Sequence, residues 1–223
     1  MTPSIAVAIV SWNTRDLLRA CLESLRADHD AGLAEVWVVD NASTDGSTQH
    51  SVYRFPTVAF TAAFNAGLYR LSGELGDRLL LEGFWNPERP RVVDWAIGAL
   101  LVVRRPAWEA AGGFDEGQWM YAEDLDLGWR LARAGWHTRY EPTARVHHHA
   151  SAATKQAWGD ERTARWQRAT YAWMLRRRGV VRTRAVAVLN VTGALARAAL
   201  FRRSRRANLG WAKLHRMGLE RDL

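Results

Sequence analysis

The chain has 223 residues, of which 48% are hydrophobic, and a formal net charge of +8. This is enough chain for one domain with a hydrophobic core and an appendage. The single cysteine, Cys21, excludes an internal disulfide bond, and the N-terminal residues MTPSIAVAIVSWN lack the basic segment and cleavage site of a signal peptide. We therefore expect a cytoplasmic protein.

Positive charge is concentrated towards the C-terminus. Residues 1–154 contain 14 Lys and Arg against 19 Asp and Glu, whereas residues 155–223 contain 17 against 4. A polyanionic partner is therefore expected to meet the tail rather than the rest of the chain.

The first predicted elements form a β-α-β unit. Residues 4–12, SIAVAIVSW, are a short apolar run typical of a strand that is buried on both faces. Leucines at helical spacing follow in residues 14–27, and EVWVVD at 35–40 predicts a second buried strand. Ligands of open α/β sheets bind beyond the carboxyl ends of the strands. Asp40 and the end of the first strand are therefore candidate ligand contacts.

The middle of the chain is less periodic. We expect a helix after Pro56, turns in residues 79–93 and a strand over residues 93–105. The segment after that strand, PAWEAAGGF, predicts a short helix that Gly112 and Gly113 end.

The stretch WMYAEDLDLGWRLARAGW, residues 119–136, places Glu123, Asp124 and Asp126 at the start of a predicted helix. The helix macrodipole stabilises an ionised carboxylate there, whereas acidic neighbours and apolar flanks raise its pKa. These opposed effects suit a general base that works near neutral pH. The alternative is ordinary charge placement in the first turn of a helix. Residues 136–149 then predict a strand or an extended segment, and residues 155–223 predict a mainly helical, basic segment.

Five blocks of sequence, in order, resemble the family 2 glycosyltransferases and especially their rhamnosyltransferase-like branch. They are VSWNTRDLLRACLESL, VVDNASTDGS, VDWAIGALLVVRR, GGFDEGQWMYAEDLDLGWRLARAGW and ARVHHHASA. The resemblance implies an α/β, GT-A-like fold over residues 1–152, with a mainly parallel sheet flanked by helices, followed by a basic helical tail over residues 153–223. It implies that the strands at Ser4–Val10 and Glu35–Val39 are parallel neighbours.

The resemblance also assigns roles to residues. Asp124 matches the catalytic base of inverting members, with Glu123 and Asp126 as further candidates beside it. Asp40 matches an aspartate that contacts the nucleoside base, and Val10 and Trp12 match positions that line the same pocket.

His148 matches a histidine near the donor diphosphate. Alternatives from local pattern stay open: Asp40 as a turn residue after a strand, and His147–His149 as a metal-binding tract or a solvated strand end.

One expected part of the family pattern is not found. Relatives carry a D-x-D-like motif that holds Mg²⁺ or Mn²⁺ against the donor diphosphate, but this chain resembles a shortened member from which the segment after residue 47 is missing. LLLEGFWNPE, residues 79–88, imitates the motif in a different sequence context. No metal ligand is assigned, and the cofactor is unknown.

The resemblance implies transfer of a sugar, with inversion, from a nucleotide-sugar donor to a lipid-linked or polysaccharide acceptor, by an active or an impaired enzyme. The alternative is a non-catalytic remnant that binds a nucleotide or a membrane surface. A nucleic-acid-binding protein is disfavoured, because the matched region is acidic and no nucleic-acid-binding motif is evident.

The tail contains an apolar stretch, residues 185–201, that is at the short limit for a membrane span and includes Arg197. As a helix it offers Val188, Leu189, Leu195, Ala199 and Leu200 for burial, with arginines at both ends. Two interpretations are open: a helix in the interface of an anionic membrane, at the inner face of the membrane, or a helix packed on the protein's own core.

Overall fold

The structure is a computed structural model that describes residues 5–8, 37–42, 50–70, 72–99, 101–118, 120–147 and 158–220. The helix predicted over residues 14–27 lies outside these ranges. The described strands are β1 (Ile5–Ala8), β2 (Trp37–Ala42), β3 (Val52–Tyr53), β4 (Arg91–Val93), β5 (Trp95–Ala96), β6 (Leu101–Arg104) and β7 (Thr138–His147).

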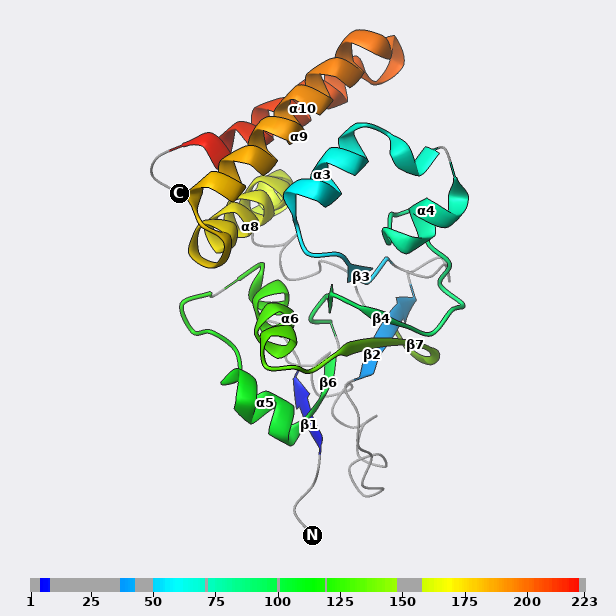
Figure 1. Ribbon diagram of the computed structural model, residues 1–223, viewed down its shortest axis with the longest axis vertical. Helices are drawn as coiled ribbons and strands as arrows, with labels where there is room; N and C mark the ends of the chain where they lie inside the picture. Colours follow the sequence, from blue (N-terminus) through cyan, green and yellow to red (C-terminus); the bar gives the residue numbers. More distant parts are fainter. Residues whose placement is uncertain are drawn as a thin grey trace. The chain divides into compact units, whose positions relative to one another are not determined.

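Five of these strands form one sheet in the order β1-β6-β2-β7-β4 (Figure 1). Strand β6 is antiparallel to both β1 and β2, β4 is antiparallel to β7, and β2 and β7 are parallel. The predicted direct pairing of β1 with β2 is therefore wrong, and so is the prediction of a mainly parallel sheet for the described strands.

The physical reason lies in β6. Leu101 and Val103 are buried, and the strand contains no proline, so both of its edges can form hydrogen bonds and it can occupy an interior position. An apolar run in the sequence indicates a buried strand but does not indicate which strands lie beside it.

The predicted strand over residues 93–105 is also divided. It contains the end of β4, β5 and β6, with turns between β5 and β6 at Gly98 and Ala99. Strand β5 pairs with β3 in a separate two-stranded sheet, where Tyr53 stacks on Trp95 with ring centroids 4.8 Å apart. The turn after β5 becomes important for the candidate site.

The helices follow the predicted pattern more closely. They are α3 (Val58–Asn65), α4 (Gly73–Arg78), α5 (Arg105–Ala111), α6 (Glu123–Arg133), α8 (Arg162–Arg178), α9 (Val180–Leu200) and α10 (Arg205–His215), with short 3₁₀ turns that include η1 (Leu68–Arg70) and η4 (Arg216–Leu219). The helix after Pro56 is confirmed: the Thr57 hydroxyl caps α3 by accepting from Phe60 N. The end of α5 is confirmed as well, because Gly112 adopts the left-handed conformation at φ 74°.

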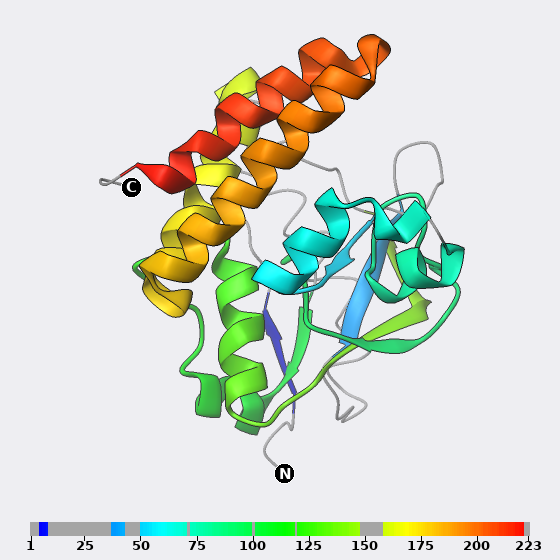
Figure 2. The same cartoon turned by 45° about the horizontal axis from the view of Figure 1, so that its top comes forward.

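The described residues group into two compact units. The first combines the described residues within 1–53, 86–119 and 123–160, and the second combines those within 54–85, 120–122 and 161–223. The second unit therefore joins α3 and α4 to the C-terminal helices, and Figure 2 shows α3 against α9, with α10 alongside α9. The division at residue 152 into a domain and a tail stays a prediction.

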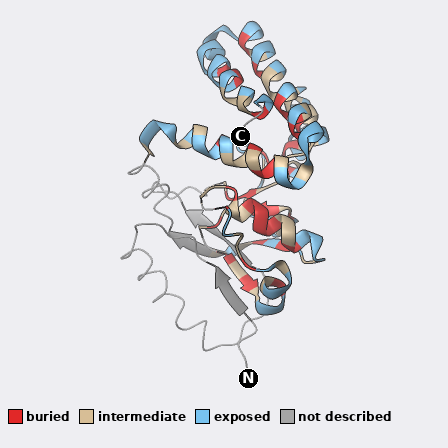
Figure 3. Ribbon diagram, turned by 90° about the vertical axis from the view of Figure 1, so that its left-hand side faces the viewer, coloured by how far each residue is buried: buried red, intermediate tan, exposed pale blue. Residues whose placement is uncertain are grey.

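Helices α8 and α9 contribute many of the buried residues of the second unit. Tyr171, Trp173 and Met174 from α8 are buried, as are Ala187, Ala194 and Ala198 from α9. Figure 3 colours the buried parts of the helices red. Small residues on α9 permit close approach: a Cβ on Gly193 would lie 2.0 Å from Asn65 Oδ1, so α3 and α9 can pack only with glycine at this position.

A chain of hydrogen bonds crosses this core. Arg197 Nη1 donates to Asn65 Oδ1 at 2.9 Å, and Asn65 Nδ2 donates to Asn190 Oδ1 at 2.9 Å. Asn190 Nδ2 lies 3.4 Å from the Tyr171 hydroxyl, which lies 2.8 Å from His215 Nδ1.

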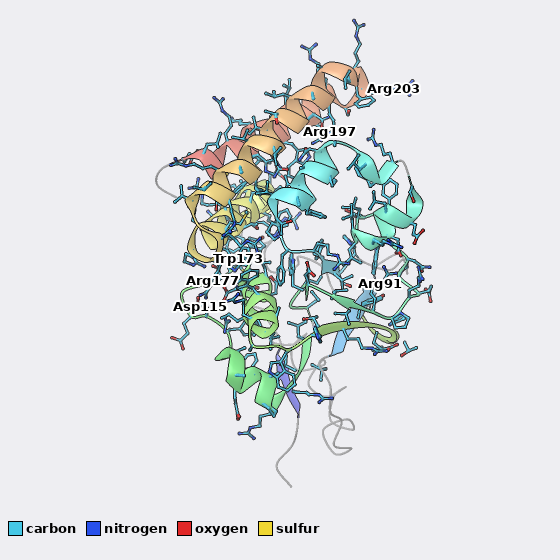
Figure 4. The ribbon with its side chains drawn as sticks, in the orientation of Figure 1. Arg91, Asp115, Trp173, Arg177, Arg197 and Arg203 are labelled. Atoms are coloured by element: carbon cyan, nitrogen blue, oxygen red, sulfur yellow. The ribbon has the colours of Figure 1, made fainter. Side chains whose placement is uncertain are left out.

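Burial and the nearby Arg197 charge lower the pKa of His215 to about 4, so its ring is neutral at physiological pH. The network joins α3, α8, α9 and α10, and Figure 4 labels Arg197 where α9 lies beside α3. Because buried polar groups need specific partners, the network fixes how these helices pack.

Candidate active site

The three acids predicted at a helix start lie in the first turn of α6. The two residues before the helix, Tyr121 and Ala122, both have a φ of 62°, which is the left-handed region that favours glycine. Two successive non-glycine residues in this region are strained, and such backbone is retained where surrounding structure holds it. The prediction that Glu123, Asp124 and Asp126 open a helix is confirmed.

Asp124 is held by two backbone donors. Its Oδ2 accepts from Gly98 N at 3.0 Å, and its Oδ1 accepts from Leu125 N at 2.7 Å. The first bond joins α6 to the turn between β5 and β6, which fixes the carboxylate relative to the sheet. Burial raises the pKa of Asp124 to about 6, although the hydrogen bonds from Gly98 and Leu125 lower it. Asp124 is therefore largely ionised at neutral pH and can accept a proton.

Glu123 has a different electrostatic environment. Burial, and secondarily the charge of Asp124, raise the pKa of Glu123 to about 8. Among the described residues, its Oε2 is buried without a hydrogen-bond partner. Burial therefore raises the pKa of both neighbouring carboxyl groups, and further for Glu123 than for Asp124.

Asp126 is fully buried and paired with Arg130. Arg130 Nε lies 2.7 Å from Asp126 Oδ2, one helical turn away, and Arg130 Nη1 donates to the carbonyl of Ala111 at the end of α5. This arrangement ties α6 to α5. The charge of Asp126 is therefore compensated inside the protein, and removing Arg130 would leave a buried, unpaired carboxylate.

Close packing fixes the position of α6 on β5. A Cβ on Gly128 would lie 2.6 Å from Trp95 Cβ and 3.3 Å from the carbonyl oxygen of Asp94. Glycine therefore allows the helix to reach the strand that leads into the Gly98 turn. The same contact thus supports both partners of the hydrogen bond between Gly98 and Asp124.

Protein groups already contact Asp124 and Asp126, and no divalent-cation site is assigned to these acids. Mg²⁺ and Mn²⁺ take several oxygen ligands from carboxylates and carbonyls. Both oxygens of Asp124 accept backbone N–H groups, and Asp126 is paired with Arg130. In the described ranges no three His, Cys, Asp or Glu side chains group as a metal site. The predicted lack of a D-x-D-like motif stays a prediction.

The other predicted site residues lie elsewhere. Asp40 is in β2, where its backbone is in register with Arg145 of β7, while Val39 is in register with Glu141. This shift leaves out the residues around Pro142, which has no N–H to donate to the ladder. Val10, Trp12 and His148 lie outside the described residues.

Two functional contacts were not predicted. The backbone of Gly98 is 26 residues from Asp124 in sequence, and no local pattern connects them. The ion pair between Asp126 and Arg130 could have been predicted from the sequence, because opposite charges four residues apart meet on one face of a helix.

The unusual protonation of Glu123 has a measurable consequence for stability. Its pKa is raised from 4.5 to about 8 in the folded state, so Glu123 binds more protons in the folded protein than in the unfolded chain between these two pH values. The free energy of unfolding should therefore fall as the pH rises from about 4.5 to about 8. Glu123→Gln, which cannot ionise, should reduce this loss by roughly 2–3 kcal/mol between about pH 5 and about pH 8.

Urea unfolding of both proteins at the two pH values measures the difference. The two proteins must be compared because His215 also makes the free energy of unfolding depend on pH, in the opposite direction. Its pKa is lowered to about 4, so this residue favours folding as the pH rises towards 6.5. Parallel pH curves for wild type and Glu123→Gln would contradict a protonated Glu123.

Two family models match the sequence. Residues 6–74 match the model described as glycosyl transferase family 2, and residues 78–214 match the model described as glycosyl transferase family group 2. The second match alone covers more than half of the chain and includes the whole acidic helix α6.

Curated relatives are similar over a shorter range. The chain is 33% identical over 150 residues to the N-acetylglucosaminyl-diphospho-decaprenol L-rhamnosyltransferase of Mycobacterium tuberculosis, covering 59% of this chain and 47% of the relative. It is 29% identical over 131 residues to the rhamnosyltransferase WbbL of Escherichia coli, covering 58% and 46%. A pre-mycofactocin glycosyltransferase of M. tuberculosis is 46% identical over 56 residues. The chain spans about half the length of the first two relatives.

Proposed function

The chain belongs to glycosyltransferase family 2, which implies a GT-A fold, and from this premise we propose that it transfers a sugar from a nucleotide-sugar donor with Asp124 as the catalytic base. In the proposed step, a hydroxyl oxygen of the acceptor attacks the anomeric carbon while Asp124 takes the hydroxyl proton. The bond from that carbon to the diphosphate breaks, and the nucleoside diphosphate leaves with the electron pair. Attack opposite the leaving group inverts the anomeric centre.

The observation that carries the proposal is the state of the Asp124 carboxylate. Two backbone N–H groups fix its position, and its raised pKa of about 6 leaves it ionised at neutral pH but more basic than an ordinary aspartate. A general base is most effective when its pKa lies close to the working pH. Glu123, which holds its own proton, does not compete for this role.

The donor contacts in this proposal come from the resemblance. Asp40 contacts the nucleoside base, Val10 and Trp12 line the same pocket, and His148 lies near the diphosphate. No step is assigned to a metal ion, because in the described residues no three His, Cys, Asp or Glu side chains group as a metal site.

The acceptor in this proposal is a lipid-linked sugar of the cell envelope. The name of one relative includes N-acetylglucosaminyl-diphospho-decaprenol, a prenyl-linked sugar. A lipid-linked acceptor requires the enzyme to work at a membrane surface. We therefore place the protein at the cytoplasmic face, associated peripherally through its basic C-terminal helices.

The test is transfer of labelled sugar from a panel of nucleoside diphosphate sugars to a membrane lipid fraction. We expect label in the lipid phase and a value of kcat/KM that rises with pH through about 6, as free Asp124 loses its proton. Binding of nucleoside diphosphates without any transfer would instead favour the non-catalytic remnant. A rate that does not change across this pH range would contradict Asp124 as the base.

A further inference from the structure

The C-terminal helices have an unusual charge distribution. Between Glu161 and Glu220 the sequence contains 15 Lys and Arg and no Asp or Glu. This segment is helical almost throughout, from α8 to η4. Its positive charges therefore have no acidic neighbours within the segment, and they attract polyanions.

Helix α9 divides into two faces. Thr183, Val186, Ala187, Ala194 and Ala198 are buried, and the helix packs against α3, α8, α10 and η4. This confirms that one face of α9 packs on the protein's own core. Apart from Val186, these buried side chains are small.

The other face is exposed and aliphatic. Val181 is 83% exposed, Val188 47% and Leu195 46%. Because these residues are spaced by seven positions, they lie on one side of the helix, together with the exposed Ala199. We call these four residues the α9 stripe. Of the residues predicted for burial, Val188, Leu195, Ala199 and Leu200 are exposed, and Leu189 is half-buried.

Exposed arginines lie at both ends of the α9 stripe. Arg182 and Arg184 are near its start, and Arg202, Arg203 and Arg206 follow the exposed pair Leu200 and Phe201 at its end. Figure 4 labels Arg203 at this end of α9 and Arg177 towards the opposite end. The 21 residues of α9 span about 31 Å at 1.5 Å per residue.

No helix in the described part of the chain is long and apolar enough to cross a membrane. An aliphatic stripe with arginines at its ends has the features of a helix that lies in the plane of a bilayer surface. Its valines and leucine would enter the boundary between headgroups and acyl chains, while the guanidinium groups contact lipid phosphates.

We propose that the α9 stripe docks on the surface of an anionic phospholipid bilayer, with α9 parallel to the membrane plane. This deepens the proposed function, and it rests on that function for the reason to be at a membrane. The docking holds the enzyme where a lipid-linked acceptor presents its sugar. The contact residues differ from those assigned to catalysis.

A nucleic acid is the other polyanion to consider, and the stripe argues against it. Affinity for nucleic acid comes from cationic and polar groups that contact phosphates, so the contact surface should be cationic along its length. Between Arg184 and Arg197 the stripe offers aliphatic side chains and no charge. A bilayer surface accepts such side chains, whereas a phosphate backbone does not.

The experiment is flotation of the full chain with vesicles of phosphatidylcholine, with and without phosphatidylglycerol. We expect binding to the anionic vesicles only. The double variant Val188→Ser/Leu195→Ser should reduce the bound fraction by about tenfold, because two aliphatic contacts are lost. Val92→Ser is the matched control, since Val92 is 56% exposed on β4 and lies outside the stripe.

Equal flotation of the double variant and the control would overturn the proposal, and so would a lack of flotation of the wild type. Binding of duplex DNA at physiological salt that the double variant reduces, or a dimer that it dissociates, would assign the stripe to another partner and also overturn it. Transfer of sugar to a water-soluble acceptor analogue separates the two proposals. Vesicle binding without sugar transfer would contradict only the proposed glycosyltransferase function. Sugar transfer without vesicle binding would contradict only the proposed docking of the α9 stripe.

Discussion

Asp124→Asn is expected to reduce sugar transfer by about 10²–10⁴-fold, the usual contribution of a general base. Asparagine keeps the shape of the side chain but cannot accept the proton from the acceptor hydroxyl. The measurement is the single-turnover rate with saturating donor, which reports chemistry rather than product release.

The same substitution has a structural cost that the experiment must separate. Both oxygens of Asp124 accept backbone N–H groups, from Gly98 and Leu125. An asparagine amide can accept from one of them but presents its own N–H₂ to the other, at a cost of about 1–3 kcal/mol. We expect a folded protein with a lower melting temperature, and circular dichroism at the assay temperature verifies that it is folded.

Two carboxyl-to-amide changes serve as controls. Glu116→Gln removes an exposed acid from the preceding loop and should leave transfer unchanged. Glu123→Gln removes the neighbouring acid and should retain most of the rate, because Glu123 is already neutral at this pH. If Asp124→Asn retained most of the wild-type rate while folded, Asp124 would not be the base.

Gly193→Ala is expected to destabilise the second unit by about 1–3 kcal/mol, the usual cost of overpacking a core. The added Cβ would lie 2.0 Å from Asn65 Oδ1 and 2.7 Å from Asn65 Cβ. Asn65 cannot move away freely, because Arg197 and Asn190 both hydrogen-bond to its amide. The methyl group therefore forces α3 and α9 apart or breaks the buried network.

The chain offers a matched control in the same unit. Gly210 lies inside α10, and nothing lies within 4 Å of a Cβ added to it. Gly210→Ala should stabilise the protein by up to about 1 kcal/mol, because alanine has a higher helix propensity. Thermal unfolding of both variants should therefore give shifts of opposite sign. A stabilising effect of Gly193→Ala would contradict the close packing of α3 on α9.

Local sequence patterns predicted the helices well because helix signals are local. Thr57 caps α3, Gly112 ends α5 and the acids open α6, and each of these features acts within a few residues. The candidate base was found in the same way, together with a family resemblance. The pairing of the strands was not predicted. Strand β6 pairs with two strands that are distant in sequence, and nothing in its own residues identifies either partner.

The environment of the candidate base was predicted only in part. Raised pKa values follow from acids among apolar residues, which is visible in the sequence. The pKa of Asp124 is also lowered by the Gly98 N–H group, which comes from a distant turn that no local pattern connects to the helix. The polar network around Arg197 was missed for a similar reason, since its members lie on α3 and on the C-terminal helices.

The discontinuous second unit has a consequence for biosynthesis. Residues 54–85 leave the ribosome well before α9, against which α3 packs. At about 5–20 residues per second, the partners of α3 arrive roughly several seconds later. During that interval α9 is not available to cover α3, so the packing of the second unit can be completed only after α9 has been synthesised. A message truncated upstream of α8 would therefore yield a chain whose residues 54–85 lack their packing partners, and not merely an enzyme without its basic end.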